Sequence, residues 1–185
     1  MSRTLKVAGA IILAAYPFAV WGAISFAGDR VAGIIALGGI AAAYFLRPRT
    51  PRARIGLNGS VFLLLAVLAL ISVLLNDRSF LLASPVLISA GMLGIFGSSL
   101  RQGQQSVVER FARSIEGDLS REKVTHCRTV TKVWCFFFVV NGSICLWLAT
   151  FSTLKSWGVY TGGISYAIMA ALFGGEYAIR RIRFG

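Results

Sequence analysis

Apolar residues occur along this chain in six long runs that are separated by polar stretches. The runs cover residues 7–27, 31–46, 57–75, 80–100, 133–151 and 157–178. A helix rises 1.5 Å per residue, so about 20 apolar residues cross the roughly 30 Å hydrocarbon layer of a membrane. Most runs approach that length, and residues 31–46 form the shortest run. The pattern predicts an all-α, polytopic membrane protein of about six transmembrane helices in antiparallel hairpins.

The fourth and fifth runs are joined by a longer polar segment, in which residues 104–124 have the pattern of an amphipathic helix. Its apolar residues recur in steps of three and four, at Val108, Phe111, Ile115 and Leu119. Because both ends of the segment are tethered to predicted spans, we expect this stripe to lie in the membrane interface. We expect Trp134 at the same interface, and Gly117 with Asp118 favours a break in the helix.

The composition agrees with a membrane protein. Hydrophobic residues make up 56% of the chain and charged residues 14%, with a mean hydropathy of +0.73. A soluble core of this size could not bury so much apolar surface. We therefore expect one integral membrane domain over residues 1–185.

The basic residues predict the orientation of the spans. The chain has 19 basic and 7 acidic residues, a formal net charge of +12. All but three of the basic residues lie in alternate connections or at the termini; the exceptions are Arg30, Arg78 and Lys155. Positive-inside bias then places both termini in the cytoplasm. This distribution favours anionic lipids of the cytoplasmic face as a partner over nucleic acid, which the net charge would suggest in a soluble protein.

The first run has two interpretations. Arg3 and Lys6 precede it, and Ser25 to Ala27 resembles the cleavage site of a signal peptide. The length of the run favours an uncleaved span. Pro17, near its middle, removes one backbone hydrogen bond and is a candidate hinge or pocket wall, or simply a bend packed against neighbouring helices.

Two polar residues fall within the last two runs. Asn141 lies near the middle of residues 133–151, where a buried amide needs a partner on another helix. It is either an interhelical packing residue or a contact for a substrate or lipid head group. Glu176 precedes Arg180 by four residues, which predicts an ion pair between them; the alternative is a role for Glu176 in proton coupling.

The sequence shows no pattern of a catalytic or metal site. His126 and Cys127 are adjacent, but one histidine and one cysteine cannot complete a zinc site. A cysteine nucleophile with a histidine base is the alternative for this pair. Since no paired carboxylates occur either, we expect a protein that is not an enzyme and has no metal or cofactor.

Short motifs resemble two groups of bacterial inner-membrane proteins. One is an uncharacterised family encoded beside aryl-polyene and fatty-acid-like biosynthesis genes, which the C-terminal half resembles at Val108–Arg113, Cys127–Phe138, Asn141-Gly142 and Gly174–Tyr177. More remotely, the order of hairpins is similar to the intracellular septation protein A family, with matching residues Asn76, Asp77, Phe80, Val133, Trp134, Phe137, Asn141, Gly142 and Trp157.

These resemblances imply a multi-pass protein of the bacterial inner membrane that supports cell-envelope or lipid-linked biosynthesis, or envelope integrity. We expect a scaffold that holds cytoplasmic biosynthetic enzymes or envelope proteins at the membrane. The alternative is a small transporter or flippase for an amphipathic lipid-like product, with Pro17, Asn141 and Glu176 along its pathway. The pattern specifies no oligomeric state.

Overall fold

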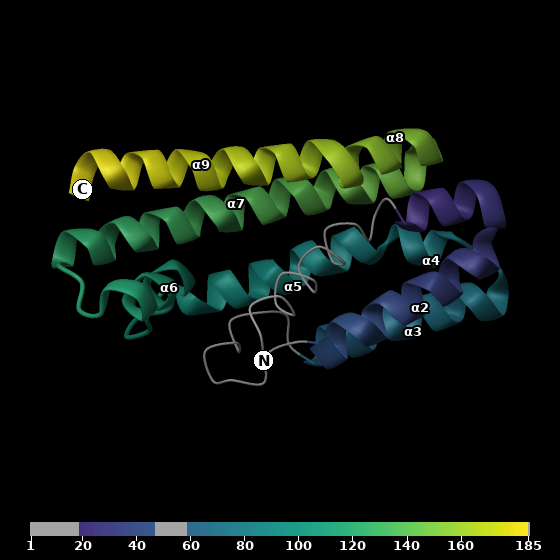
Figure 1. Cartoon of the computed structure of the whole chain (residues 1–185), viewed down its shortest axis with the longest axis horizontal. Helices are drawn as coiled ribbons and strands as arrows, with labels where there is room; N and C mark the ends of the chain where they lie inside the picture. The colour runs from purple at the N-terminus through teal and green to yellow at the C-terminus, as the bar shows by residue number, and fades with distance from the viewer. Residues whose placement is uncertain (1–18, 47–58, 185) are drawn as a thin grey trace.

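The computed structural model describes residues 19–46 and 59–184, and in these two ranges helices are joined by turns and short loops, with no strand in either (Figure 1). The predicted all-α class is therefore confirmed. Of the first apolar run, residues 19–27 are helical, and Gly28, with a positive φ of 86°, separates them from the next helix. Pro17 lies outside the described residues, as does the arginine-rich connection at 47–54.

Helices α2 (Asp29–Leu46) and α3 (Gly59–Leu75) pack side by side. Their close approach depends on Gly33, because a Cβ atom there would lie 2.5 Å from Cγ2 of Val73. The turn after α3 includes Asn76, whose φ is 53°. In that turn the carboxylate of Asp77 accepts a hydrogen bond of 2.8 Å from the backbone N–H of Ser79, which lowers the pKa of Asp77.

The fourth run forms two helices in place of one. Helix α4 (Ser79–Leu82) is followed by Ala83 alone, and α5 (Ser84–Ser99) begins at the next residue. Pro85 falls in the first turn of α5, where the missing N–H is tolerated because it would have no partner within the helix.

The polar segment contains α6 (Val107–Glu116) and also the start of α7 (Arg121–Phe151). The predicted break at Gly117 is confirmed, with φ at 78°, and Leu119 lies in the break. The helix that contains the fifth predicted span begins at Arg121, twelve residues before the apolar run that starts at residue 133. The side chain of Ser120 accepts a hydrogen bond from the N–H of Lys123 and so caps a helix of 31 residues, about 46 Å long.

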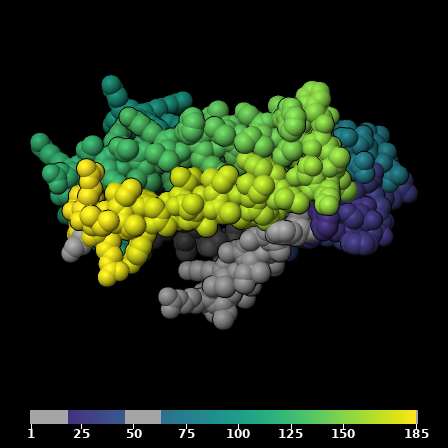
Figure 2. Space-filling model, turned by 90° about the horizontal axis from the view of Figure 1, so that it is seen from above, coloured from purple at the N-terminus to yellow at the C-terminus, as the bar shows by residue number. Residues whose placement is uncertain are grey.

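The last run forms α8 (Leu154–Val159), a π-helical turn η2 (Tyr160–Ile164) and α9 (Ser165–Phe184). The helical region extends beyond both ends of the predicted run. Helix α9 returns along α7, so the C-terminus lies at the end of the molecule that also holds α6 (Figures 1 and 2). We call this the α6 end, and the opposite end, where α8 lies, the α8 end.

Within residues 19–46 and 59–184, two helical stretches, Ser79–Ser99 and Arg121–Phe151, are long and apolar enough to cross a membrane, and Leu63–Leu75 is a shorter apolar helix. This finding gives partial support to the prediction of a membrane protein. The topology of six spans stays a prediction.

Two groups of buried side chains hold the helices together. Near the α8 end, aliphatic residues surround Trp157, whose indole N–H donates to the backbone oxygen of Leu82 at 3.2 Å. Here Gly158 lies against Trp21, since a Cβ atom on it would be 2.5 Å from Cδ1 of that ring. The second group lies toward the α6 end and is mostly aromatic. It consists of Phe96, Val107, Trp134, Phe137 and Phe138.

Candidate functional site

Asn141 is the centre of a polar network inside the apolar helices. Its side-chain N–H donates to Ser89 Oγ on α5 at 3.0 Å. Its Oδ1 accepts two hydrogen bonds, from the hydroxyl of Tyr160 at 3.2 Å and from Ser165 Oγ at 2.8 Å. The residue is only 8% exposed. The prediction that Asn141 has a partner on another helix is confirmed, and this one amide joins α5, α7, η2 and α9.

The π-helical turn explains why two hydroxyl groups reach the same oxygen. Tyr160 and Ser165 are five residues apart, and in an α-helix at 100° per residue they would point roughly 140° away from each other. In η2 the backbone N–H of Ser165 donates to the carbonyl of Tyr160, closing a wider turn. The wider turn brings both side chains to face Asn141.

Close packing of the backbone accompanies these hydrogen bonds. A Cβ atom on Gly142 would lie 3.2 Å from Cβ of Ser89, so the residue beside Asn141 has to be small for α5 to approach α7. The Oδ1 lone pairs are both used, and one side-chain N–H is engaged by Ser89. This geometry favours the interhelical packing role of Asn141 among the two that the sequence left open.

A second site is α6, which packs against α7 and is joined to α5 by a hydrogen bond at its start. Ser106 caps the helix by accepting from the N–H of Glu109, and Ser99 on α5 accepts from the N–H of Val107 at 3.1 Å. Val107, Glu109 and Ala112 are buried. The carboxylate of Glu109 is compensated by Arg113, whose Nε lies 2.9 Å away.

Glu116 ties α6 to two other helices. It accepts a hydrogen bond from Lys123 of α7 at 2.9 Å and forms an ion pair with Arg180 of α9. The hydrogen bond from Lys123 is the main reason that the pKa of Glu116 is lowered, and the charge of Arg180 adds to it. The predicted pair between Glu176 and Arg180 is wrong, because Glu116 pairs with Arg180 instead. Glu176 is half-buried and forms no hydrogen bond or ion pair within residues 19–46 and 59–184.

The predicted apolar stripe of α6 faces away from the other helices. Phe111 is 52% exposed and Ile115 81% exposed. Val108 differs, because it packs against the aromatic group, and Leu119 is half-buried in the break after α6. Trp134, which we expected at the membrane interface, is only 7% exposed and lies among the rings of Phe96, Phe137, Phe138 and Phe173.

Arg128 contributes a contact that the sequence did not predict. Its Nη2 donates to the backbone oxygen of Leu100 at 2.7 Å, and Nη1 donates to that of Gln104 at 3.2 Å. Leu100 is the C-cap of α5, so the guanidinium satisfies a carbonyl at the negative end of that helix. The arginine thereby positions the chain between α5 and α6.

His126 and Cys127 do not come together with other ligands. The ring of His126 packs edge-on against Phe184, with 5.6 Å between the ring centroids, and Cys127 is buried. Within the two described ranges no group of three or more histidine, cysteine, aspartate or glutamate side chains could hold a metal ion.

Comparison of the chain with protein-family models, curated proteins and solved structures finds no match. The two resemblances seen in the sequence motifs stay predictions. Sequence reasoning missed Ser89, Tyr160 and Ser165 as partners of Asn141, and Glu116 as the partner of Arg180. The one available signal was that a buried amide and a surplus of arginines need partners.

Proposed function

We propose that this chain is a non-enzymatic, six-span protein of the bacterial inner membrane that holds cytoplasmic enzymes of envelope or lipid-linked biosynthesis at the bilayer. In this proposal α6 and both termini lie on the cytoplasmic side. One observation carries it: α6 buries acidic and small side chains against α7 while Phe111 and Ile115 stay exposed.

Helix α6 has three faces at 100° per residue. Glu109 and Ala112 face α7, and Phe111 and Ile115 form an apolar face beside them. The basic residue Arg110 lies on the remaining side, near the exposed Ser114; it is half-buried, and its Nε has no hydrogen-bond partner among the described residues. An apolar face that alternates with a basic one is typical of a helix in the head-group region of a membrane. The apolar face then rests in the cytoplasmic leaflet, and the basic side is left for a partner.

The distribution of charge supports this orientation. The last turn of α9 carries Arg181 and Arg183 and lies at the α6 end, whereas α4 and α8 lie at the opposite end (Figure 1). Basic residues near an anionic leaflet each contribute about 1 kcal/mol of membrane attraction. The α6 end is therefore the end that positive-inside bias assigns to the cytoplasm. The envelope role itself rests on the resemblance of the sequence motifs.

Photo-crosslinking from two positions of α6 tests the proposal. A photoreactive amino acid in place of Ile115 is expected to label lipid, and one in place of Ser114 is expected to label a peripheral enzyme of envelope or lipid biosynthesis. Arg110→Glu should release that enzyme from the membrane fraction, whereas Arg183→Gln serves as a control that changes a charge on α9. Recovery of no biosynthetic enzyme from position 114, or unchanged enzyme retention in Arg110→Glu, would argue against the scaffold.

A small transporter or flippase for an amphipathic lipid-like product is the second candidate function. One observation favours it: Glu176 is half-buried on α9 and forms no hydrogen bond or ion pair among the described residues, and a carboxylate within a membrane span is typical of a transport pathway. Reconstituted vesicles should then move such a product, and Glu176→Gln should abolish the movement while Glu122→Gln does not. Movement at the wild-type rate in Glu176→Gln would exclude this mechanism.

A further inference from the structure

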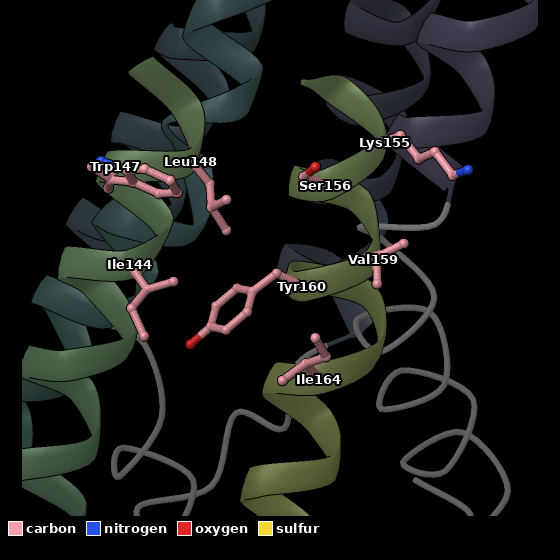
Figure 3. A pocket seen from close by; sticks show the side chains of 8 residues that line it. All are labelled: Ile144, Trp147, Leu148, Lys155, Ser156, Val159, Tyr160 and Ile164. Atoms are coloured by element: carbon pink, nitrogen blue, oxygen red, sulfur yellow. The ribbon is translucent and has the colours of Figure 1, made fainter. Parts of the chain in front are cut away.

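An apolar groove opens between α7 and the α8–η2 segment (Figure 3). It lies at the α8 end, and α6 lies at the opposite end (Figure 1). Its volume is about 390 Å³, within the range of roughly 300–1,000 Å³ that is common for small-molecule sites. Most of its lining consists of large apolar side chains, namely Ile144, Trp147, Leu148, Val159, Tyr160 and Ile164. The groove lies apart from α6 and shares Tyr160 with the Asn141 network.

The polar groups of the groove lie at one end only. Lys155 and Ser156 stand at the start of α8, at the level of Trp147, and Ile144 and Ile164 lie further along the groove (Figure 3). A site for a uniformly apolar molecule would not need this order. A charged rim followed by an apolar interior matches a molecule with a polar head and a hydrocarbon tail.

Tyr160 keeps the interior of the groove apolar. Its side chain extends from η2 toward α7, as Figure 3 shows, and its hydroxyl group donates to Asn141. Because that bond occupies the hydroxyl group, the ring is held in place and presents carbon atoms to the groove. The π-helical turn that serves the Asn141 network therefore also shapes one wall of the groove.

Lys155 gives the rim an uncompensated positive charge. It is exposed and forms no ion pair with the acidic residues of the described ranges. Its ammonium group is directed away from Tyr160, so it would meet a group that lies outside the groove (Figure 3). Trp147 is 58% exposed beside this rim, and tryptophan favours the level of the lipid head groups.

We propose that this groove binds one acyl chain of an anionic membrane phospholipid, with the lipid head group held at the rim by Lys155. The apolar walls accommodate the chain, and the charge of Lys155 selects a negative head group over a neutral or zwitterionic one. The proposal rests on insertion of the helices into a bilayer and not on the scaffold role of α6.

Photolabelling in vesicles of defined composition tests the site. The full chain is reconstituted in phosphatidylcholine that contains a small fraction of phosphatidylglycerol with a photoactivatable acyl chain, and adducts are mapped by mass spectrometry. We expect adducts on groove residues, and we expect Ile164→Trp to remove most of them by filling the space. Ile168→Trp, which adds the same ring on α9 outside the lining, should keep them. Equal labelling of the two variants would overturn the proposed groove.

The head-group preference is measured with a phosphatidylcholine probe that carries the same photoactivatable chain. Lys155→Gln should reduce the preference for phosphatidylglycerol roughly five-fold, while Arg78→Gln, a charge change in the turn before α4, should not. Equal labelling of the wild-type groove by the two probes would contradict the proposal. The α6 crosslinks to an enzyme are measured separately in cells, so failure of the groove is distinguished from failure of the scaffold.

Discussion

The two halves of α7 are held by different kinds of interaction. In its first half, Lys123 and Arg128 make charged contacts to Glu116 and to the end of α5, and Trp134 packs among rings. In its second half, Asn141 makes uncharged hydrogen bonds, and Gly142 allows close contact with α5. Charged contacts at a surface respond to salt and pH, whereas buried amide and hydroxyl bonds do not. We therefore expect that α6 can detach while the α8 end of the molecule stays assembled.

The largest effect is expected from Trp134→Ala, which would leave a cavity among the rings of Phe96, Phe138 and Phe173. Replacing a buried tryptophan by alanine lowers the free energy of unfolding by about 3–5 kcal/mol. Unfolding in mixed detergent micelles measures it. Trp147→Ala is the matched control, because Trp147 is an exposed tryptophan of the same helix. Equal losses in the two variants would show that the aromatic group does not hold the helices together.

Asn141→Leu should have the next largest effect. It removes three hydrogen bonds and leaves the hydroxyl groups of Ser89, Tyr160 and Ser165 without this partner. At about 0.6 kcal/mol for each interhelical bond in a membrane protein, the free energy of unfolding should fall by about 2 kcal/mol. The same unfolding titration measures this loss, and it should not change with salt. Ser143→Ala is the control, since Ser143 bonds only to the backbone of its own helix, at Val139; a loss no larger than the control's would contradict the network.

Glu116→Gln should have the smallest effect on global stability but a clear effect on α6. The pKa of Glu116 is lowered below its ordinary value of 4.5 in the folded protein, so its carboxylate stabilises α6 docking above that pH. The contribution is lost as the pH falls through the folded pKa. The protection of the α6 amides, which is the exchange rate compared with the intrinsic rate at the same pH, should therefore fall on acidification in the wild type and be low already at neutral pH in Glu116→Gln. Glu122→Gln should behave like the wild type, and identical exchange in all three proteins would exclude the Glu116 contact.

Much of the fold could be predicted because apolar runs and helix-breaking residues can be recognised in the sequence itself. The apolar runs located α2, α3 and α5, and Gly117 indicated the end of α6. The start of α7 could not be found in this way, since residues 121–132 are polar although helical. A boundary based on hydropathy marks where a helix would enter lipid and not where its hydrogen bonding begins.

The candidate sites were predicted less completely, because partners depend on tertiary packing. The position of Asn141 indicated that other helices had to supply a hydrogen-bond acceptor and a donor. The convergence of Tyr160 and Ser165 on this residue depends on a π turn, which has no clear pattern in the sequence. Arg180 had an acidic residue four positions away and still paired with Glu116 of α6. The spacing of four residues between Glu176 and Arg180 therefore did not decide the ion pair, because α9 returns to the α6 end and brings Arg180 to Glu116.

The side of the membrane on which α6 lies is the central claim, and cysteine labelling tests it most directly. Ser114→Cys places a thiol on the exposed part of α6, and Arg78→Cys places one in the turn at the α8 end. The wild type, with Cys127, Cys135 and Cys145, gives the background. We expect a membrane-impermeant maleimide to label position 114 only in inverted vesicles and position 78 only in intact spheroplasts. Labelling of position 114 in intact spheroplasts would contradict the account.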